Sequence, residues 1–204
     1  MAAHVERTRR FRATVLNLPN QLTTLRLILA AILFGLIAWE FYLWALVVFV
    51  VAASTDWLDG YYARKFGQVT TLGRILDPFA DKVIICGTFV FLLAAPEMMA
   101  TPYGLRAWMV VVIVGRELLV TALRSFLEER GSDFSAKRSG KWKMLLQCVA
   151  GGASLYYLSY PVPRLNAPAW ALWSTIGTIW AAVLLTVYSG VVYVYAAARL
   201  LRTR

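Results

Sequence analysis

Long stretches without charged residues dominate the pattern of hydrophobic and polar positions in this chain. Residues 165–198 contain no charged side chain, and neither do residues 83–96 and 107–115. A helix that spans a bilayer needs roughly 20 mostly apolar residues. Together with the other apolar stretches, this pattern predicts six transmembrane helices, at about 21–38, 42–65, 74–95, 105–128, 139–160 and 169–198.

Short polar or proline-containing segments separate the predicted helices. Pro19 and Asn20 mark a break before the first helix, and a short turn near Glu40 makes the second helix antiparallel to the first. Pro78 falls in the opening turns of the third helix, where proline is tolerated because the first N–H groups have no intrahelical partner. The sequence therefore predicts an all-α integral membrane protein whose membrane domain covers residues 19–204.

A basic juxtamembrane segment, residues 1–18, precedes this domain. It carries four arginines among scattered apolar residues. This composition favours a short amphipathic helix lying on anionic lipid headgroups. A solvated tail is the open alternative.

The net charge of +10 is distributed unevenly along the chain. Basic residues gather at both termini and in segments 64–74 and 130–143, whereas the connections at the other ends of the predicted helices hold few. By the positive-inside rule, both termini and these segments face the cytoplasm. Because topology explains the charge, we do not expect nucleic acid as a partner.

Composition narrows the function classes further. The chain is 60% hydrophobic, compared with about 45–50% for a typical soluble domain, which supports the membrane class. The only histidine is His4, in the N-terminal segment. Histidine-based zinc chemistry and a Ser-His-Asp triad are therefore not expected.

Four of the five aspartates lie between residues 56 and 81, in the pattern D-x-x-D-G-x-x-A-R-(x8)-G-x-x-x-D-x-x-x-D. Asp56 and Asp59 are three residues apart on the second predicted helix, so they share a face of it. Asp77 and Asp81 are four apart on the third helix and also share a face. The connection between the two helices is long enough for a turn, so the helices can bring the four carboxylates together.

Four clustered carboxylates repel one another at low dielectric unless cations neutralise them. Two divalent cations would do so, and an all-oxygen ligand set suits Mg²⁺ or Mn²⁺. Paired metal ions also clamp the attacking and leaving oxygens in phosphoryl transfer. Structural ion pairs such as Asp59 with Arg64 and Asp77 with Lys82 are the alternative, but they do not explain the small residues Gly60 and Ala63.

The same pattern resembles the signature of the CDP-alcohol phosphotransferases. That resemblance implies six transmembrane helices, a homodimer, and the transfer of a phosphoalcohol group with CMP as the leaving group in a reaction that depends on Mg²⁺ or Mn²⁺. The matching positions are Asp56, Asp59, Gly60, Ala63, Arg64, Gly73, Asp77 and Asp81.

The resemblance also implies roles for individual residues. Asp56, Asp59 and Asp77 are implied to be metal ligands, and Asp81 a ligand that also serves as the catalytic base. Contacts to CDP-diacylglycerol are implied for Pro19, Asn20, Gln21, Leu22, Gly60, Ala63, Arg64, Thr70 and Gly73.

A second group of residues bears on the acceptor alcohol. Arg116 interrupts an apolar helix, and Arg124 follows about two turns later on roughly the same face. With Lys141 across the next connection, they could form a cationic pocket suited to a phosphate-bearing acceptor. Basic residues placed by topology alone, or an arginine paired with a metal-site aspartate, are the alternatives.

Three runs resemble the bacterial phosphatidylglycerophosphate synthases, at residues 17–26, 115–124 and 139–147. This resemblance implies sn-glycerol 3-phosphate as acceptor, with the active site on the cytoplasmic side of a bacterial cytoplasmic membrane. Trp142 and Met144 depart from the subfamily's usual residues. Inositol phosphate, phosphatidylglycerol and serine are alternative acceptors, and a cation transporter is the alternative from another class.

Overall fold

The computed structural model describes residues 18–66, 71–129 and 138–202, and the regular structure within these ranges is entirely helical. The prediction of an all-α fold is confirmed. Two short helices lie between the long ones, α5 (Pro96–Ala100) and α8 (Pro163–Asn166). The long helices are α2 (Leu18–Ala38), α3 (Tyr42–Phe66), α4 (Thr71–Ala94), α6 (Ala107–Glu129), α7 (Arg138–Leu158) and α9 (Ala169–Arg202).

These bounds correct two details of the prediction. Helix α2 begins at Leu18, so Pro19 and Asn20 lie in its first turn and are not a break before it. A proline is compatible with this turn because the missing N–H has no partner there. Helix α4 begins at Thr71 and therefore includes Gly73, which the sequence placed in a loop. The amphipathic segment predicted before Leu18 lies outside the described residues.

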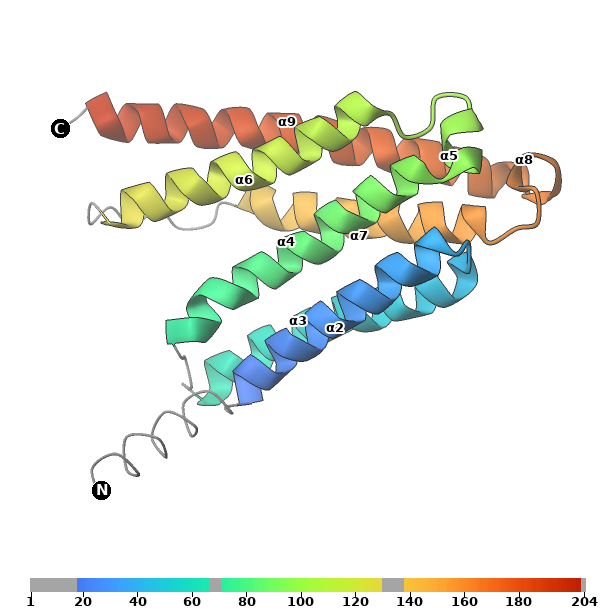
Figure 1. Ribbon diagram of the computed structural model, residues 1–204. Helices are drawn as coiled ribbons and strands as arrows, with labels where there is room; N and C mark the ends of the chain where they lie inside the picture. The colour runs from blue at the N-terminus through green and yellow to red at the C-terminus, as the bar shows by residue number, and fades with distance from the viewer. Residues whose placement is uncertain (1–17, 67–70, 130–137, 203–204) are drawn as a thin grey trace, which may run out of the picture.

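Consecutive long helices run antiparallel in one bundle, as Figure 1 shows. The starts of α2, α4 and α7 and the ends of α3, α6 and α9 lie at one end of the bundle, which we call the motif end. Helices α5 and α8 lie at the opposite end. Helix α4 is central because it contacts α2, α3, α6 and α7, while α7 and α6 both contact α9.

The turn between α2 and α3 explains their close antiparallel pairing. The Phe41 N–H donates to the Leu36 carbonyl over 2.8 Å, and the Glu40 N–H donates to the Ile37 carbonyl over 3.0 Å. These two bonds form a Schellman motif, which requires a left-handed residue at the position after the helix cap. Glu40 occupies that position with a φ of 63°, where glycine is the usual residue.

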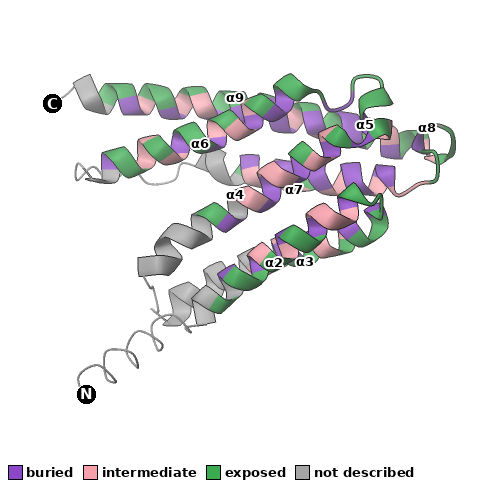
Figure 2. Cartoon of the chain, in the orientation of Figure 1, coloured by how far each residue is buried: buried purple, intermediate pink, exposed green. Residues whose placement is uncertain are grey.

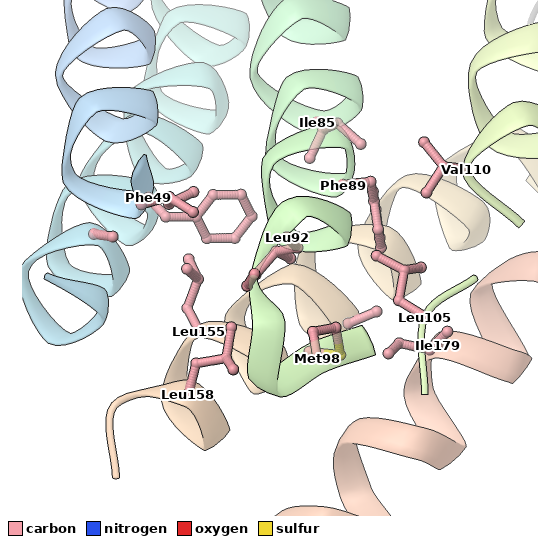
Figure 3. Close-up of a cluster of buried hydrophobic side chains, with 14 of the residues drawn as sticks. Phe49, Ile85, Phe89, Leu92, Met98, Leu105, Val110, Leu155, Leu158 and Ile179 are labelled. Atoms are coloured by element: carbon pink, nitrogen blue, oxygen red, sulfur yellow. The ribbon is translucent and has the colours of Figure 1, made fainter. Parts of the chain in front are cut away.

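The apolar core extends through the middle of the bundle and toward the α5 end. Figure 2 shows buried residues on the facing sides of the helices and exposed residues on their outer sides. In the close-up of Figure 3, Phe49 and Leu155 lie on one side of α4 and Phe89 on the other, near Leu105, so that side chains of several helices interdigitate around α4. All four are almost fully buried. Such interdigitation fixes how the helices lie relative to one another.

The outer surface of the bundle is unusually apolar. Large hydrophobic residues are exposed on every long helix, for example Val47, Val111, Leu184 and Val191. Within the described residues, one helical segment is long and apolar enough to cross a membrane, Ala169–Arg199. Shorter apolar segments occur in α2, α3 and α4. The count of six membrane spans therefore stays a prediction.

Candidate active site

The helix order brings the candidate metal ligands to the motif end of the bundle. Asp56 and Asp59 lie in the second half of α3, and Asp77 and Asp81 lie in the first half of α4. These two helices are antiparallel and in contact. The side chains of all four aspartates lie outside the described part of the structure, so their convergence on metal ions stays a prediction. The described side chains contain no further group of three potential metal ligands.

The residues predicted to contact CDP-diacylglycerol belong to the same end of the molecule. Pro19, Asn20, Gln21 and Leu22 lie in the first turns of α2, where Gln21 is exposed. Gly60, Ala63 and Arg64 lie in the last turns of α3, and Gly73 in the first turn of α4. Thr70 and the other side chains of this group lie outside the described residues, so their contacts are not tested.

A buried ionic cluster connects α6 and α7. Glu117 Oε1 accepts hydrogen bonds from Arg116 Nη1, over 3.2 Å, and from Lys143 Nζ. The exposed fractions of these side chains are 9% for Arg116, 10% for Glu117 and 5% for Lys143. Two cations therefore share one carboxylate in a site that is nearly closed to solvent.

Arg116 also packs against α9. Its guanidinium carbon lies 5.4 Å from the centre of the Tyr193 ring, in a cation–π arrangement. A Cβ built on Gly190 would lie 3.2 Å from Arg116 Cγ, so the absent side chain at Gly190 provides the space for the arginine stem. The Nε–H group of Arg116 is buried and donates to no acceptor among the described residues.

Arg124 lies two turns further along α6 from Arg116, as the spacing predicts. Its side chain is partly buried, and its Nε likewise has no hydrogen-bond partner within the described residues. Val120 lies between the two arginines and packs with Tyr193 and Leu127. The face of α6 that holds the arginines is therefore directed toward α9 and is not fully exposed.

Lys141 lies in the first turn of α7, but its side chain lies outside the described residues. Lys141 and Lys143 are two positions apart on α7. Between them, Trp142 is 63% exposed and therefore does not fill the interior of the bundle. Met144 is partly buried.

Glu117 and Lys143 were not predicted from the sequence as members of the site. By sequence, Lys143 belongs with the basic residues of the 130–143 segment, yet in the structure it is only 4% exposed. The four-residue periodicity of α7 could have indicated it, because Lys143, Gln147, Ala150 and Ser154 all lie on its buried face. The Gln147 side-chain amide donates to Thr186 Oγ1 of α9 over 3.1 Å, which extends this polar interior.

The buried cluster of Arg116 and Lys143 around Glu117 carries cations of the kind that bind phosphate oxygens. The chain belongs to the CDP-alcohol phosphatidyltransferase family, whose model matches residues 16–196. It is thus a transferase of a membrane-associated family that generally uses divalent metal ions. The resemblance predicted from the aspartate motif is confirmed, and the cation-transporter alternative is left without a supporting observation.

Within that family, the chain is similar in sequence to several curated proteins. The CDP-diacylglycerol–glycerol-3-phosphate 3-phosphatidyltransferase of Bacillus subtilis is 34% identical over 189 residues, which cover 85% of this chain and 91% of the relative. The Escherichia coli protein of the same name is 34% identical over 191 residues, or 89% and 94% of the two chains. A probable phosphatidylglycerophosphate synthase of Mycobacterium tuberculosis is 35% identical over 201 residues, or 92% and 85%.

Proposed function

We propose that this protein transfers the phosphatidyl group of CDP-diacylglycerol to sn-glycerol 3-phosphate, with phosphatidylglycerophosphate and CMP as products. The names of its relatives support the two substrates. The observation in the structure that carries the acceptor assignment is the buried cluster of Arg116, Glu117 and Lys143. The alternative acceptors differ in whether they bring a phosphate to this cluster.

The charge balance of the cluster favours a phosphate-bearing acceptor. Arg116 and Lys143 contribute two positive charges and Glu117 one negative charge, which leaves an excess of one positive charge. Buried cations are costly unless they are paired, and the arginine fork matches phosphate oxygens. Arg124, on the same face of α6, adds a second guanidinium, and Lys141 is a fourth candidate cation. Glycerol 3-phosphate supplies the missing negative charge, whereas serine supplies no phosphate.

The aspartate motif is proposed to hold the metal ions. Asp56, Asp59, Asp77 and Asp81 offer only oxygen donors, which fits Mg²⁺ or Mn²⁺, and the contact between α3 and α4 is compatible with a shared site. When bound, two such ions neutralise charge on the diphosphate and its leaving group. The nucleotide end of CDP-diacylglycerol is assigned to the residues of α2, α3 and α4 already described, together with Thr70.

The chemical step is proposed to be a single displacement. Asp81 accepts the proton of the 1-hydroxyl of glycerol 3-phosphate. At the same time, the oxygen of that hydroxyl forms a bond to the phosphorus that carries diacylglycerol. The bond between that phosphorus and the bridging oxygen breaks, and CMP leaves with the electron pair. No covalent enzyme intermediate is needed, because the incoming hydroxyl and the leaving CMP meet at the same phosphorus.

The bundle is proposed to span the membrane six times as a homodimer, with the motif end and both termini in the cytoplasm. Exposed tryptophans support the placement of the opposite end at a membrane interface, since tryptophan is enriched at headgroup level. Trp39, Trp44, Trp108, Trp170 and Trp173 all lie at or near the helix ends farthest from the aspartates, and each is at least half exposed. Glycerol 3-phosphate would then reach the site from water and CDP-diacylglycerol from the bilayer.

An acceptor screen tests the proposal. The purified protein, with Mg²⁺ and radiolabelled CDP-diacylglycerol, is offered glycerol 3-phosphate, inositol phosphate, phosphatidylglycerol or serine in parallel. Labelled phosphatidylglycerophosphate and an equal amount of CMP are expected with glycerol 3-phosphate alone. Product with another acceptor, and none with glycerol 3-phosphate, would overturn the acceptor assignment while leaving the family assignment intact.

A further inference from the structure

Glu117 connects two helices through a single oxygen atom. Its Oε1 accepts from Arg116 on the same helix, α6, and from Lys143 on α7. All three side chains are about nine-tenths buried or more. Without the carboxylate, the two cations would face each other at low dielectric and repel. Glu117 therefore keeps Arg116 and Lys143 close to each other in the interior.

The arginine is held from three directions. Its Nη1 donates to Glu117, its guanidinium lies over the Tyr193 ring, and its stem fits against Gly190. Two of these contacts come from α9 and constrain position, whereas the hydrogen bond to Glu117 constrains the rotation of the planar guanidinium. A guanidinium binds phosphate well only when its fork is aligned with the oxygens.

We infer that Glu117 is a positioning residue for the acceptor phosphate: it does not touch the substrate, but holds the Arg116 guanidinium in the orientation that binds it. This inference rests on the proposed function, in which glycerol 3-phosphate binds at Arg116. A carboxylate facing a phosphate would be repulsive, so Glu117 acts from the side of Arg116 away from the ligand. Lys143 neutralises the Glu117 carboxylate and so further reduces the repulsion between this carboxylate and the phosphate.

A purely structural role for Glu117 makes a different prediction. If the carboxylate serves only to compensate the buried charge of Lys143, it becomes dispensable once that charge is removed. If it positions Arg116, it stays necessary for acceptor binding even without Lys143. The two roles are therefore separated by replacing Glu117 in a chain that lacks the lysine charge.

The experiment compares Lys143→Met with the double variant Lys143→Met/Glu117→Gln in the full-length protein. Adding Glu117→Gln is expected to raise the KM for glycerol 3-phosphate about tenfold, a size typical of a lost charge-assisted hydrogen bond, with the KM for CDP-diacylglycerol changed by less than about twofold. The double variant should melt at a lower temperature, because Arg116 then lacks its carboxylate partner, so the inference is tested by the difference between the two KM values. An unchanged KM for glycerol 3-phosphate, or an equal rise in both KM values, overturns the inference.

A second variant covers the case in which the double variant does not fold. Glu117→Asp keeps the charge for Lys143 but shortens the side chain by one methylene, so the hydrogen bond to Arg116 is weakened. A raised KM for glycerol 3-phosphate with an unchanged KM for CDP-diacylglycerol supports the inference, and unchanged values for both substrates overturn it. If the wild-type protein forms no product from glycerol 3-phosphate, the proposed function itself fails, and this inference fails with it.

Discussion

Gly190 of α9 leaves the space that the Arg116 side chain of α6 occupies, since a Cβ at position 190 would lie 3.2 Å from Arg116 Cγ. Such a contact is tight, and the neighbour must move by a few tenths of an ångström. Gly190→Ala should therefore displace the guanidinium from its place over Tyr193. We expect the KM for glycerol 3-phosphate to rise by about threefold to tenfold, because a misplaced binding group weakens the contact it makes. Steady-state kinetics with each substrate varied in turn measure this.

Gly177 provides a matched control for this prediction. It lies on the same helix, and a Cβ there would meet no atom within 4 Å. Gly177→Ala should leave both KM values unchanged and should stabilise the helix by about 0.5–1 kcal/mol, the usual gain for alanine over glycine. Equal kinetic effects of the two substitutions would show that Gly190 has no special relationship with Arg116.

Gly87 allows α4 to pack against α2. A Cβ at position 87 would lie 2.1 Å from the ring of Phe34, which is itself stacked on Phe91 at 4.9 Å between ring centres. Gly87→Ala forces the ring or the helix to move, so we expect a loss of about 1–3 kcal/mol in the free energy of unfolding, as for other overpacked sites. Thermal unfolding in detergent, followed by circular dichroism, measures the loss.

The same contact suggests a rescue and a control for the Gly87 prediction. Combining Gly87→Ala with Phe34→Leu removes the ring and should restore part of the lost stability. Gly35→Ala, on α2, would place its Cβ at ordinary contact distance from Trp39, so it should not destabilise the protein and should give the usual gain of about 0.5–1 kcal/mol for alanine over glycine in a helix. A melting temperature for Gly87→Ala equal to that of Gly35→Ala would contradict the packing shown by the structure.

Glu40 is strained where it closes the turn between α2 and α3. Its φ of 63° costs a non-glycine residue roughly 1–2 kcal/mol, and part of this is regained by glycine. Glu40→Gly should therefore raise the free energy of unfolding by about 0.5–1 kcal/mol after the entropy cost of glycine in the unfolded chain. Glu40→Ala keeps the strain, so its melting temperature should stay near that of the wild type. Stabilisation by alanine as large as by glycine would argue against a left-handed conformation at this position.

The long helices could be predicted from the sequence because each contains an apolar stretch close to the length needed. Helix α3 was predicted at about 42–65 and is observed at Tyr42–Phe66. The errors occur at helix starts, where Pro19 and Gly73 were taken as breaks. Proline and glycine are common in breaks but are also tolerated in a first turn, and local sequence does not distinguish the two cases.

The partner of Arg116 could not be predicted because it depends on how separate helices pack. From sequence, a metal-site aspartate was an available partner for this arginine, and Lys143 was one of several basic residues. The structure pairs Arg116 with its sequence neighbour Glu117 and brings Lys143 to the same oxygen from α7. Which face of α7 is buried determines this arrangement, and that face is fixed by its contacts with α3, α4 and α9.

Removal of divalent cations should abolish the transfer reaction reversibly. Because four clustered carboxylates need cations to neutralise them, incubation with EDTA should eliminate product formation, and added Mg²⁺ or Mn²⁺ should restore it.

Asp81→Asn should lower kcat by at least about 10²-fold, since it removes a base as well as a ligand. The variant should keep a near-wild-type melting temperature when both proteins are measured in EDTA, where no metal contributes to stability. Glu97→Gln, which removes a carboxylate from the far end of the bundle, is the matched control and should retain full, metal-dependent activity. Full activity of Asp81→Asn would exclude this residue as the base, whereas activity that persists in EDTA would exclude metal dependence for the whole motif.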